Sequence, residues 1–212
     1  MIRYRCNPPA VIKTLFNDFK WNSSVDKILV TFDDGPLPGN TEAILKMLDN
    51  YKIKAAFFCV GNNILRNPGL AEDLLAEGHL IGNHTFNHKK VTGISGPDLL
   101  EEILSFNKLL EDKYAYKVKF FRPPHGKFNL KLNKILKGNG MVNVMWSLLT
   151  YDFKCDLNIF KDIVNNYLEN NSIVVLHDNI KSKPIIHESI EYLMEKILER
   201  GLVIGEPAEC LK

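Results

Sequence analysis

The chain has 212 residues, of which 45% are apolar and 25% are charged, so it is long enough to bury one large core. Its formal net charge of +2 comes with lysines scattered along the chain, and we therefore expect no nucleic acid as a partner. No run approaches the roughly 20 apolar residues that a transmembrane helix needs, so we expect no membrane span.

The first 26 residues predict a helical extension that precedes a main domain of residues 27–212. Apolar residues recur there at helical spacing, namely Val11, Ile12, Leu15, Phe16 and Phe19. A membrane-surface anchor is the alternative use of such a stripe, and we expect it instead to pack on the outside of the main domain. The basic N-terminus is not followed by the apolar run of a secretory signal, so we expect a cytoplasmic protein.

Apolar runs of strand length alternate with segments of helical periodicity along the chain. The predicted strands are Ile28–Phe32, Ala55–Val60, Leu80–Asn83, Val118–Phe121, Met141–Trp146, Ser172–His177 and Leu202–Gly205. The predicted helices are Thr41–Tyr51, Pro68–Glu77, Gly96–Tyr114, Leu130–Gly138, Leu157–Glu169 and Pro184–Arg200. This unbroken alternation predicts an α/β domain with one parallel sheet, either open and doubly wound or closed as a barrel.

Reactive side chains follow several of the predicted strands. These residues are Asp33 and Asp34, His84 and His88, Arg122 and His125, Asp152, and His177 with Asp178. The active sites of barrels and open α/β sheets lie at the carboxyl ends of the strands. We therefore expect these side chains to meet at that end of the sheet.

Two of these groups predict a metal site. A pair of carboxylates at the end of a buried strand needs a cationic partner. His84 and His88 are four residues apart, and two imidazoles with one carboxylate suit a divalent transition metal. Because Asp33 and Asp34 are adjacent, they would face opposite sides of a regular strand, so we expect the chain to bend at Gly35-Pro36.

Five segments, in order, resemble the motifs of the polysaccharide deacetylase family (carbohydrate esterase family 4, the NodB-homology domain). They are Thr31–Pro36, His84–His88, Arg122–Gly126, Trp146–Phe153 and Leu176–Asp178. The resemblance implies a distorted (β/α) barrel, usually of seven parallel strands, and seven strands are predicted above. The fourth segment departs from the pattern, since many members carry aspartate at the position of Leu149 and tryptophan at that of Phe153.

The resemblance also implies a metal and its ligands. It assigns Asp34, His84 and His88 to one divalent ion. Zinc is our first expectation, and cobalt, nickel or manganese are alternatives because geometry and availability decide which ion is bound.

Four further residues are implied to be catalytic. Asp33 is expected to act as the general base toward the attacking water, held ionised and oriented by Arg122. His177 is expected to act as the general acid that protonates the departing amine. Asp152 would pair with His177 and raise its pKa.

The surroundings of the acetyl group follow from the same resemblance. The backbone N–H of His125 is expected to donate to the oxyanion. Phe153 and Leu176 are expected to form the walls of the pocket that holds the acetyl methyl group. We interpret Trp146 as a core or wall residue in preference to a platform on which a sugar ring stacks.

The expected activity is metal-dependent hydrolysis of N-acetyl groups on N-acetylglucosamine units of a polysaccharide or oligosaccharide, with release of acetate, by a monomer. Peptidoglycan, chitin oligomers and a lipid-linked sugar all remain open as substrates. The alternative is an O-acetyl esterase acting on xylan or a related glycan at the same site. A non-catalytic glycan-binding domain has only the departures at Leu149 and Phe153 in its favour. A glycosidase fits poorly, because its two carboxyls must face each other across ~5–9 Å.

Overall fold

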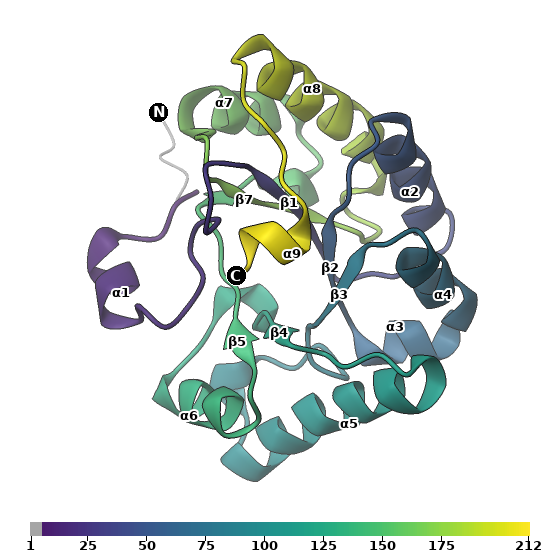
Figure 1. The fold of residues 1–212 in the computed structure, drawn as a ribbon, viewed down its shortest axis with the longest axis vertical. Helices are drawn as coiled ribbons and strands as arrows, with labels where there is room; N and C mark the ends of the chain where they lie inside the picture. Colours follow the sequence, from purple (N-terminus) through teal and green to yellow (C-terminus); the bar gives the residue numbers. More distant parts are fainter. Residues whose placement is uncertain (1–5) are drawn as a thin grey trace.

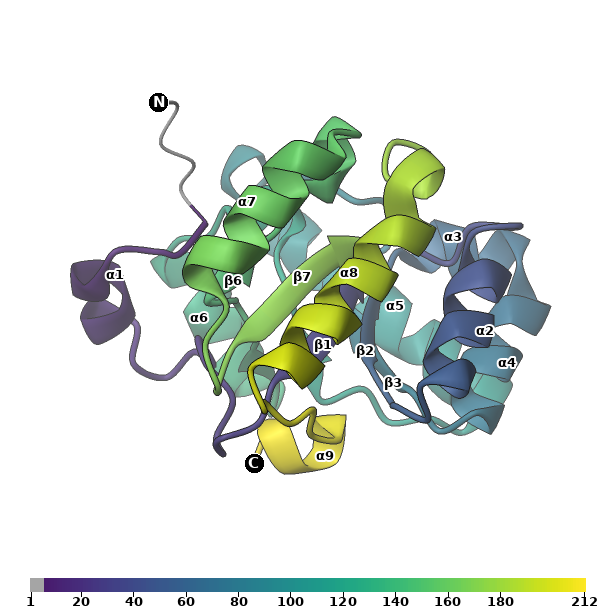
Figure 2. The same ribbon diagram turned by 90° about the horizontal axis from the view of Figure 1, so that it is seen from above.

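A computed structural model describes residues 6–212 and shows one curved sheet of seven parallel strands surrounded by helices (Figure 1, Figure 2). The strands are β1 (Leu29–Asp33), β2 (Ala56–Cys59), β3 (Leu80–Asn83), β4 (Phe120–Phe121), β5 (Val142–Asn143), β6 (Leu148–Leu149) and β7 (Ile173–His177). The helices are α1 (Ala10–Leu15), α2 (Thr41–Asn50), α3 (Gly61–Arg66), α4 (Pro68–Ala76), α5 (Gly96–Tyr114), α6 (Leu130–Gly138), α7 (Leu157–Tyr167), α8 (Ile186–Glu199) and α9 (Pro207–Cys210).

The strand order is β5-β4-β3-β2-β1-β7-β6, so the sheet curls into a distorted (β/α) barrel that stays open between β5 and β6. The predicted fold class is therefore confirmed. In the register of the central strands, Asp33 at the end of β1 lies opposite Phe58 on β2 and His177 on β7. The ladder thus brings together two of the reactive residues that are far apart in the sequence.

The strands form because their side chains are buried on both faces, as in other parallel sheets covered by helices. Outward-facing residues of β1 and β7, such as Val30 and Leu176, join the large core beneath the helices. Inward-facing residues such as Leu29 and Ile173 form a smaller core with Cys210 at the end of α9. This short helix covers the amino-terminal end of the barrel (Figure 2), opposite the carboxyl ends of the strands.

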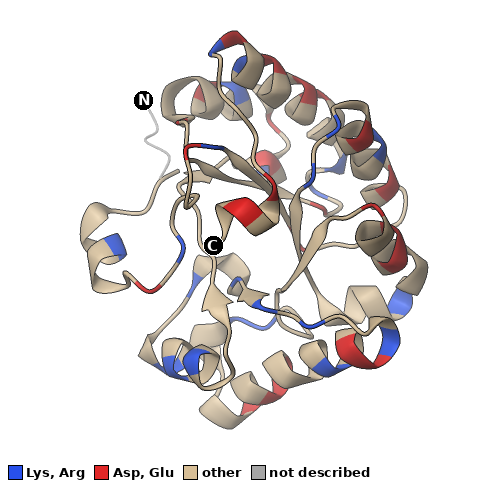
Figure 3. Ribbon diagram, viewed as in Figure 1, with Lys and Arg blue, Asp and Glu red and all other residues tan. Residues whose placement is uncertain are grey.

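Charged residues of both signs alternate along the outer faces of α2, α5 and α8 (Figure 3). Their apolar faces, by contrast, contribute buried residues to the core, as expected for amphipathic helices. In residues 6–212, none of the helices combines the length and the apolar character needed to cross a membrane.

Two predicted strands differ most from the structure. Leu202–Gly205 is not a strand, because only Ile204 pairs with Ile28 before the chain turns into α9. The seventh strand is instead β6, which lies beyond the predicted strand Met141–Trp146. That prediction is too long, because the chain leaves the sheet after β5, where Val144 pairs with Lys20.

Residues 6–26 run along the open side of the barrel. Lys20 bridges to Val144 next to β5, and the backbone N–H of Leu149 on β6 donates to Cys6 at 2.9 Å. The apolar stripe is only partly used, since Val11 is 63% exposed and Leu15 is 69% exposed. Phe16 and Phe19 pack on the domain, whereas residues 1–5 of the predicted extension lie outside the described residues.

Candidate active site

A cavity of about 350 Å³ opens at the carboxyl ends of the strands, and we call it the central cavity. Its lining consists of Asp33, Asp34, His84, His88, His125, Gly126, Trp146, Leu149, Phe153, His177, Asn179 and Lys181. Residues from all five motif segments therefore meet in one place. Two of the predicted site residues, Arg122 and Asp152, are buried directly behind this lining.

The three predicted metal ligands lie within reach of one ion. Asp34 Oδ1 is 3.0 Å from His88 Nε2 and 3.5 Å from His84 Nε2, and the ligand atoms of the three residues all lie within 4.8 Å of one another. Tetrahedral bonds of 2.0–2.1 Å to zinc place neighbouring ligand atoms about 3.3 Å apart. The residues therefore fit a divalent ion with open positions for further ligands.

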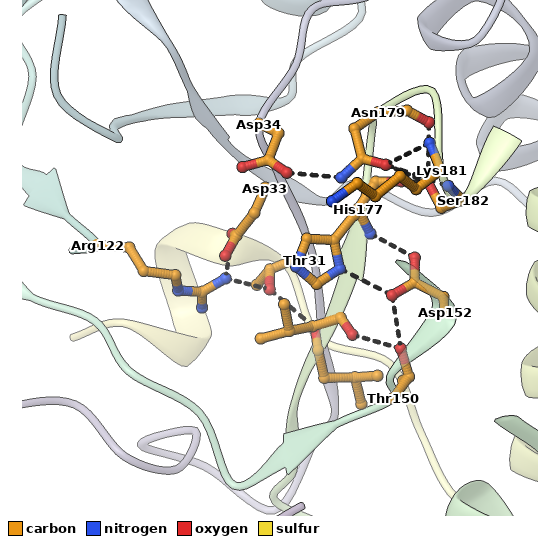
Figure 4. A network of polar contacts seen from close by, with 12 residues as sticks. Thr31, Asp33, Asp34, Arg122, Thr150, Asp152, His177, Asn179, Lys181 and Ser182 are labelled. Atoms are coloured by element: carbon orange, nitrogen blue, oxygen red, sulfur yellow. Dashed lines mark hydrogen bonds and ion pairs between the residues drawn. The ribbon is translucent and has the colours of Figure 1, made fainter. Parts of the chain in front are cut away.

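Hydrogen bonds to the protein orient these ligands. His84 Nδ1 lies 2.7 Å from the carbonyl oxygen of Arg122, which leaves the Nε2 lone pair toward the cluster. Asn179 Nδ2 donates to Asp34 Oδ2 at 2.6 Å and leaves Oδ1 for the imidazoles (Figure 4). Burial by itself would raise the pKa of Asp34, but His84 and His88 hold it well below its usual range.

The bend predicted after the two aspartates begins one residue earlier, at Asp34 itself. Its φ of +78° lies in the left-handed region, which turns its carboxylate away from that of Asp33. Thr85 and His88 also have positive φ, at +66° and +56°. Such backbone is uncommon outside glycine and clusters at functional sites, where surrounding contacts hold it.

Asp33 is paired with a fully buried arginine. Arg122 Nη1 donates to Asp33 Oδ1 at 2.7 Å and to Thr31 Oγ1 at 2.7 Å (Figure 4). Its remaining nitrogens donate to the carbonyl oxygens of Val144 and Met145, each at 3.0 Å. The guanidinium therefore lies in the barrel interior and fixes the position of the Asp33 carboxylate at the floor of the central cavity.

His177 is held by a buried carboxylate on the opposite side. Asp152 Oδ1 is 2.7 Å from His177 Nδ1, and Asp152 Oδ2 accepts the backbone N–H of His177 at 2.7 Å (Figure 4). Burial opposes a positive charge on His177, but Asp152 outweighs burial and raises the pKa of His177 to about 9. A protonated imidazole thus faces the central cavity at neutral pH.

The predicted surroundings of the acetyl group are present only in part. His125 has a φ of +58° in the loop after β4, and its ring packs edge-on against His88 at 4.9 Å. Phe153 lines the central cavity beside His177, at 4.9 Å between ring centroids. Leu176, however, faces the core beneath the helices, because adjacent strand residues point to opposite sides and His177 takes the inner one.

Several residues that line the cavity were not assigned a role from the sequence. Leu149 lies in the lining, where Leu176 was expected. Asn179 and Lys181 follow His177 in the loop after β7, so their position after a strand end was the available signal. Asp178 does not line the cavity: it is buried and accepts hydrogen bonds from Asn40 and Thr41 (2.7 and 2.6 Å), so it orients its loop.

Comparison with known proteins gives the family. The family model described as "Polysaccharide deacetylase" matches residues 20–144, more than half of the chain. The chain belongs to the polysaccharide deacetylase family. A peptidoglycan-N-acetylglucosamine deacetylase of Bacillus cereus is 34% identical over 188 residues, which are 87% of this chain and 88% of the relative.

Further similarity extends to longer proteins and to a solved structure. The peptidoglycan-N-acetylglucosamine deacetylase PgdA of Listeria monocytogenes is 31% identical over 82% of this chain, which spans only 36% of the length of PgdA. The crystal structure of the Bc1960 peptidoglycan N-acetylglucosamine deacetylase superposes with a TM-score of 0.88 and 22% identity, over 96% of both chains. This likeness supports the barrel fold described above.

Proposed function

We propose that this polysaccharide deacetylase family member hydrolyses N-acetyl groups on N-acetylglucosamine units of a glycan of the peptidoglycan or chitin-oligomer type, releasing acetate. The observation that carries the proposal is that two ion pairs each present one member to the central cavity. One carboxylate, Asp33, is paired with Arg122 at 2.7 Å, and one imidazole, His177, is paired with Asp152 at 2.7 Å. Both face the cluster of Asp34, His84 and His88, and all these residues come from one chain, so a monomer suffices.

Asp34, His84 and His88 would hold a divalent ion, and zinc is our proposal for its identity. When bound, the ion supplies Lewis acidity that polarises a carbonyl and lowers the pKa of water. Asp33 is placed to accept a proton from the attacking water, because Arg122 occupies one of its oxygens and leaves the other free toward the cavity. The backbone N–H of His125 is proposed to stabilise the oxyanion.

His177 is proposed to protonate the leaving nitrogen. An amine is a poor leaving group unless it is protonated, whereas an alcohol leaves an ester with less help. The buried His177–Asp152 pair therefore favours amide over ester hydrolysis. Phe153 and Leu149, which both line the central cavity, offer apolar contact for the acetyl methyl group.

Acetate release from an N-acetylglucosamine pentamer tests the proposal. Chelator-stripped protein is assayed with and without added zinc or cobalt, and mass spectrometry follows the loss of acetyl groups. Metal-restored release is expected, with little release from acetylated xylan. Release from acetylated xylan alone would instead make the chain an O-acetyl esterase, and tight metal binding without any release would support a glycan-binding domain.

The variant Asp33→Asn tests the base in the same assay. Asparagine keeps an oxygen acceptor for Arg122 but cannot take a proton, so turnover should fall by about 10²-fold or more. Zinc binding should be retained, because Asp33 is not among the three ligands. Turnover close to that of the unmodified protein would exclude Asp33 as the base.

A further inference from the structure

A second hollow of about 410 Å³ opens beside the central cavity, and we call it the side hollow. It is lined by Asp34, Val60, Asn62, Asn63, Arg66, Asn87, His88, Asn179, Ile180 and Lys181. Asp34, His88, Asn179 and Lys181 line both spaces, so the two join at the metal ligands. A glycan with one unit in the central cavity would place a neighbouring unit in the side hollow.

The amide nitrogens of the side hollow are already used by the protein. Asn63 Nδ2 donates to the carbonyl oxygen of Asp34 at 2.8 Å, and Asn179 Nδ2 donates to the Asp34 carboxylate at 2.6 Å. Asn62 Nδ2 donates to Asn87 Oδ1 at 2.5 Å, and Asn87 Nδ2 donates to a carboxylate on α5 at 2.8 Å. Each of these amide groups therefore commits one of its two N–H bonds to the protein and helps to build the wall of the hollow.

Two cationic side chains remain available in this hollow. Arg66, at the end of α3, and Lys181, in the loop after β7, are exposed and have no ion-pair partner among residues 6–212. Asp34 is the one carboxylate in the described lining, and it is engaged by two imidazoles and an amide. The side hollow consequently carries an unneutralised positive charge.

The position of Lys181 links this charge to the reaction site. Figure 4 shows its side chain extending over His177 toward Asp34, and Lys181 lines both cavities. Arg66 lies in the side hollow only. An anion between these two cations would thus belong to the unit next to the one that reacts.

We propose that the side hollow is a subsite for a sugar unit that carries a carboxylate, adjacent in the glycan to the N-acetylglucosamine unit that is deacetylated. The inference rests on the proposed function. It narrows the proposed substrate to an anionic glycan, in preference to neutral chitin. The guanidinium of Arg66 and the ammonium of Lys181 supply the donors that a carboxylate needs. Electrostatic complementarity of this kind selects between substrates more than it raises overall affinity.

The test compares three tetrasaccharides with the zinc-loaded full chain. One is a glycan strand of peptidoglycan freed of peptides, in which alternate units carry a carboxylate. The second is the same strand with its carboxylates reduced to alcohols, and the third is a chitin tetramer. The variants are Arg66→Gln, Lys181→Gln and the double variant, with Lys46→Gln on α2 as the matched control.

Each single variant should lower kcat/KM on the carboxylate strand about threefold to tenfold, mainly by raising KM. The double variant should lose more, and added salt should shrink the difference. On the reduced strand and on the chitin tetramer, Arg66→Gln, which lies outside the central cavity, should stay within about twofold of the unmodified chain. Lys181→Gln should lose less on these two glycans than on the carboxylate strand. Equal losses on all three glycans, or no loss on any, would overturn the proposal.

Binding separates this inference from the proposed function. Calorimetry on the zinc-loaded Asp33→Asn chain compares the carboxylate strand with the reduced strand, with and without the two glutamine substitutions. A preference for the carboxylate strand that these substitutions remove supports the subsite even if the unmodified chain releases no acetate. Acetate release from all three glycans without such a preference supports the deacetylase and overturns the subsite.

Discussion

Two adjacent carboxylates, Asp33 and Asp34, have different partners in this molecule. Asp33 continues the inward face of β1 and meets Arg122 inside the barrel at 2.7 Å. Asp34 has a φ of +78°, so its carboxylate turns toward the imidazoles at the rim instead of the opposite face of the sheet. One residue of irregular backbone therefore separates a carboxylate suited to accept a proton from one suited to bind a cation.

Asp152→Asn should change the pH profile through His177. Asparagine removes the charge that raises the pKa of His177 to about 9, so that pKa should fall toward or below its ordinary value of 6.5. If His177 must be protonated to release the amine, the alkaline limb of kcat/KM should move down by about two pH units. Asp156→Asn is the matched control, because asparagine also caps the start of α7. An unmoved alkaline limb would exclude His177 as the acid.

The same pair makes stability depend on pH. The folded-state pKa of His177, about 9, lies above its ordinary value of 6.5, so its charge stabilises the fold below pH 6.5. That stabilisation is lost as the pH rises toward 9. Urea unfolding of the chelator-stripped chain should show a free energy of unfolding that falls by about 2–3 kcal/mol over this window. Asp152→Asn should flatten the dependence.

Gly35→Ala should disturb the turn that carries both aspartates. A methyl group at Gly35 would lie 2.2 Å from Asp178 Oδ2, and Asp178 is fixed by Asn40 and Thr41. The free energy of unfolding should fall by about 1–3 kcal/mol, with weaker zinc binding. Gly69→Ala on α4 is the control, because its methyl group would meet nothing within 4 Å. Equal unfolding free energies for the two variants would contradict the expected clash.

At the scale of elements, the sequence predicted long segments better than short ones. The helices Gly96–Tyr114 and Leu130–Gly138 have the predicted bounds, because several turns of periodicity and their N-caps define them. Strands β4, β5 and β6 have two residues each, too few for an alternating pattern. Helix α3, which follows β2 directly, is absent from the predicted helices, and it is only six residues long. Its residues line the side hollow.

The same contrast holds for the site. Asp33, His84, Arg122 and His177 could be placed because strand ends converge at one edge of a parallel sheet. Leu149 could not, since a residue at the end of a two-residue strand reveals no face by pattern. The exchange of Leu176 for Leu149 in the cavity lining became clear only from the structure.

Helix α5 supports the metal-ligand loop through Glu102. This glutamate is 4% exposed and accepts the backbone N–H of Asn87 at 2.7 Å and its side-chain amide at 2.8 Å. Glutamine has one oxygen for these two donors, so Glu102→Gln should leave one unsatisfied and loosen His88. Zinc affinity should fall about 10–100-fold in chelator competition. Glu101→Gln, at the exposed neighbouring position, provides the control. Unchanged zinc affinity in Glu102→Gln would show that the metal-ligand loop does not depend on Glu102.

At the scale of the whole molecule, segments from both ends of the chain complete the barrel. Cys210 and Leu211 close its amino-terminal end from within. Residues 6–21 lie along the opening between β5 and β6 and pair with the backbone on both sides. Unpaired strand edges are a liability that proteins cover with other segments. Residues 6–21 cover the two edge strands of this sheet. No local pattern in the sequence predicts which edge a terminal segment covers.

Phe19→Ala tests whether this segment is part of the folding unit. Phe19 is 4% exposed, and its ring packs on Phe16, Trp21 and Phe128 at 5.2–5.9 Å between centroids. Removing a buried phenylalanine side chain typically costs ~3–5 kcal/mol, so the urea midpoint should fall in a single transition for the whole chain. Leu15→Ala, at a 69% exposed position of the same stripe, should change stability by less than about 0.5 kcal/mol. If the Phe19→Ala chain were as stable as the Leu15→Ala chain, the barrel would fold independently of this segment. Its packing across the opening between β5 and β6 would then contribute nothing to the free energy of unfolding.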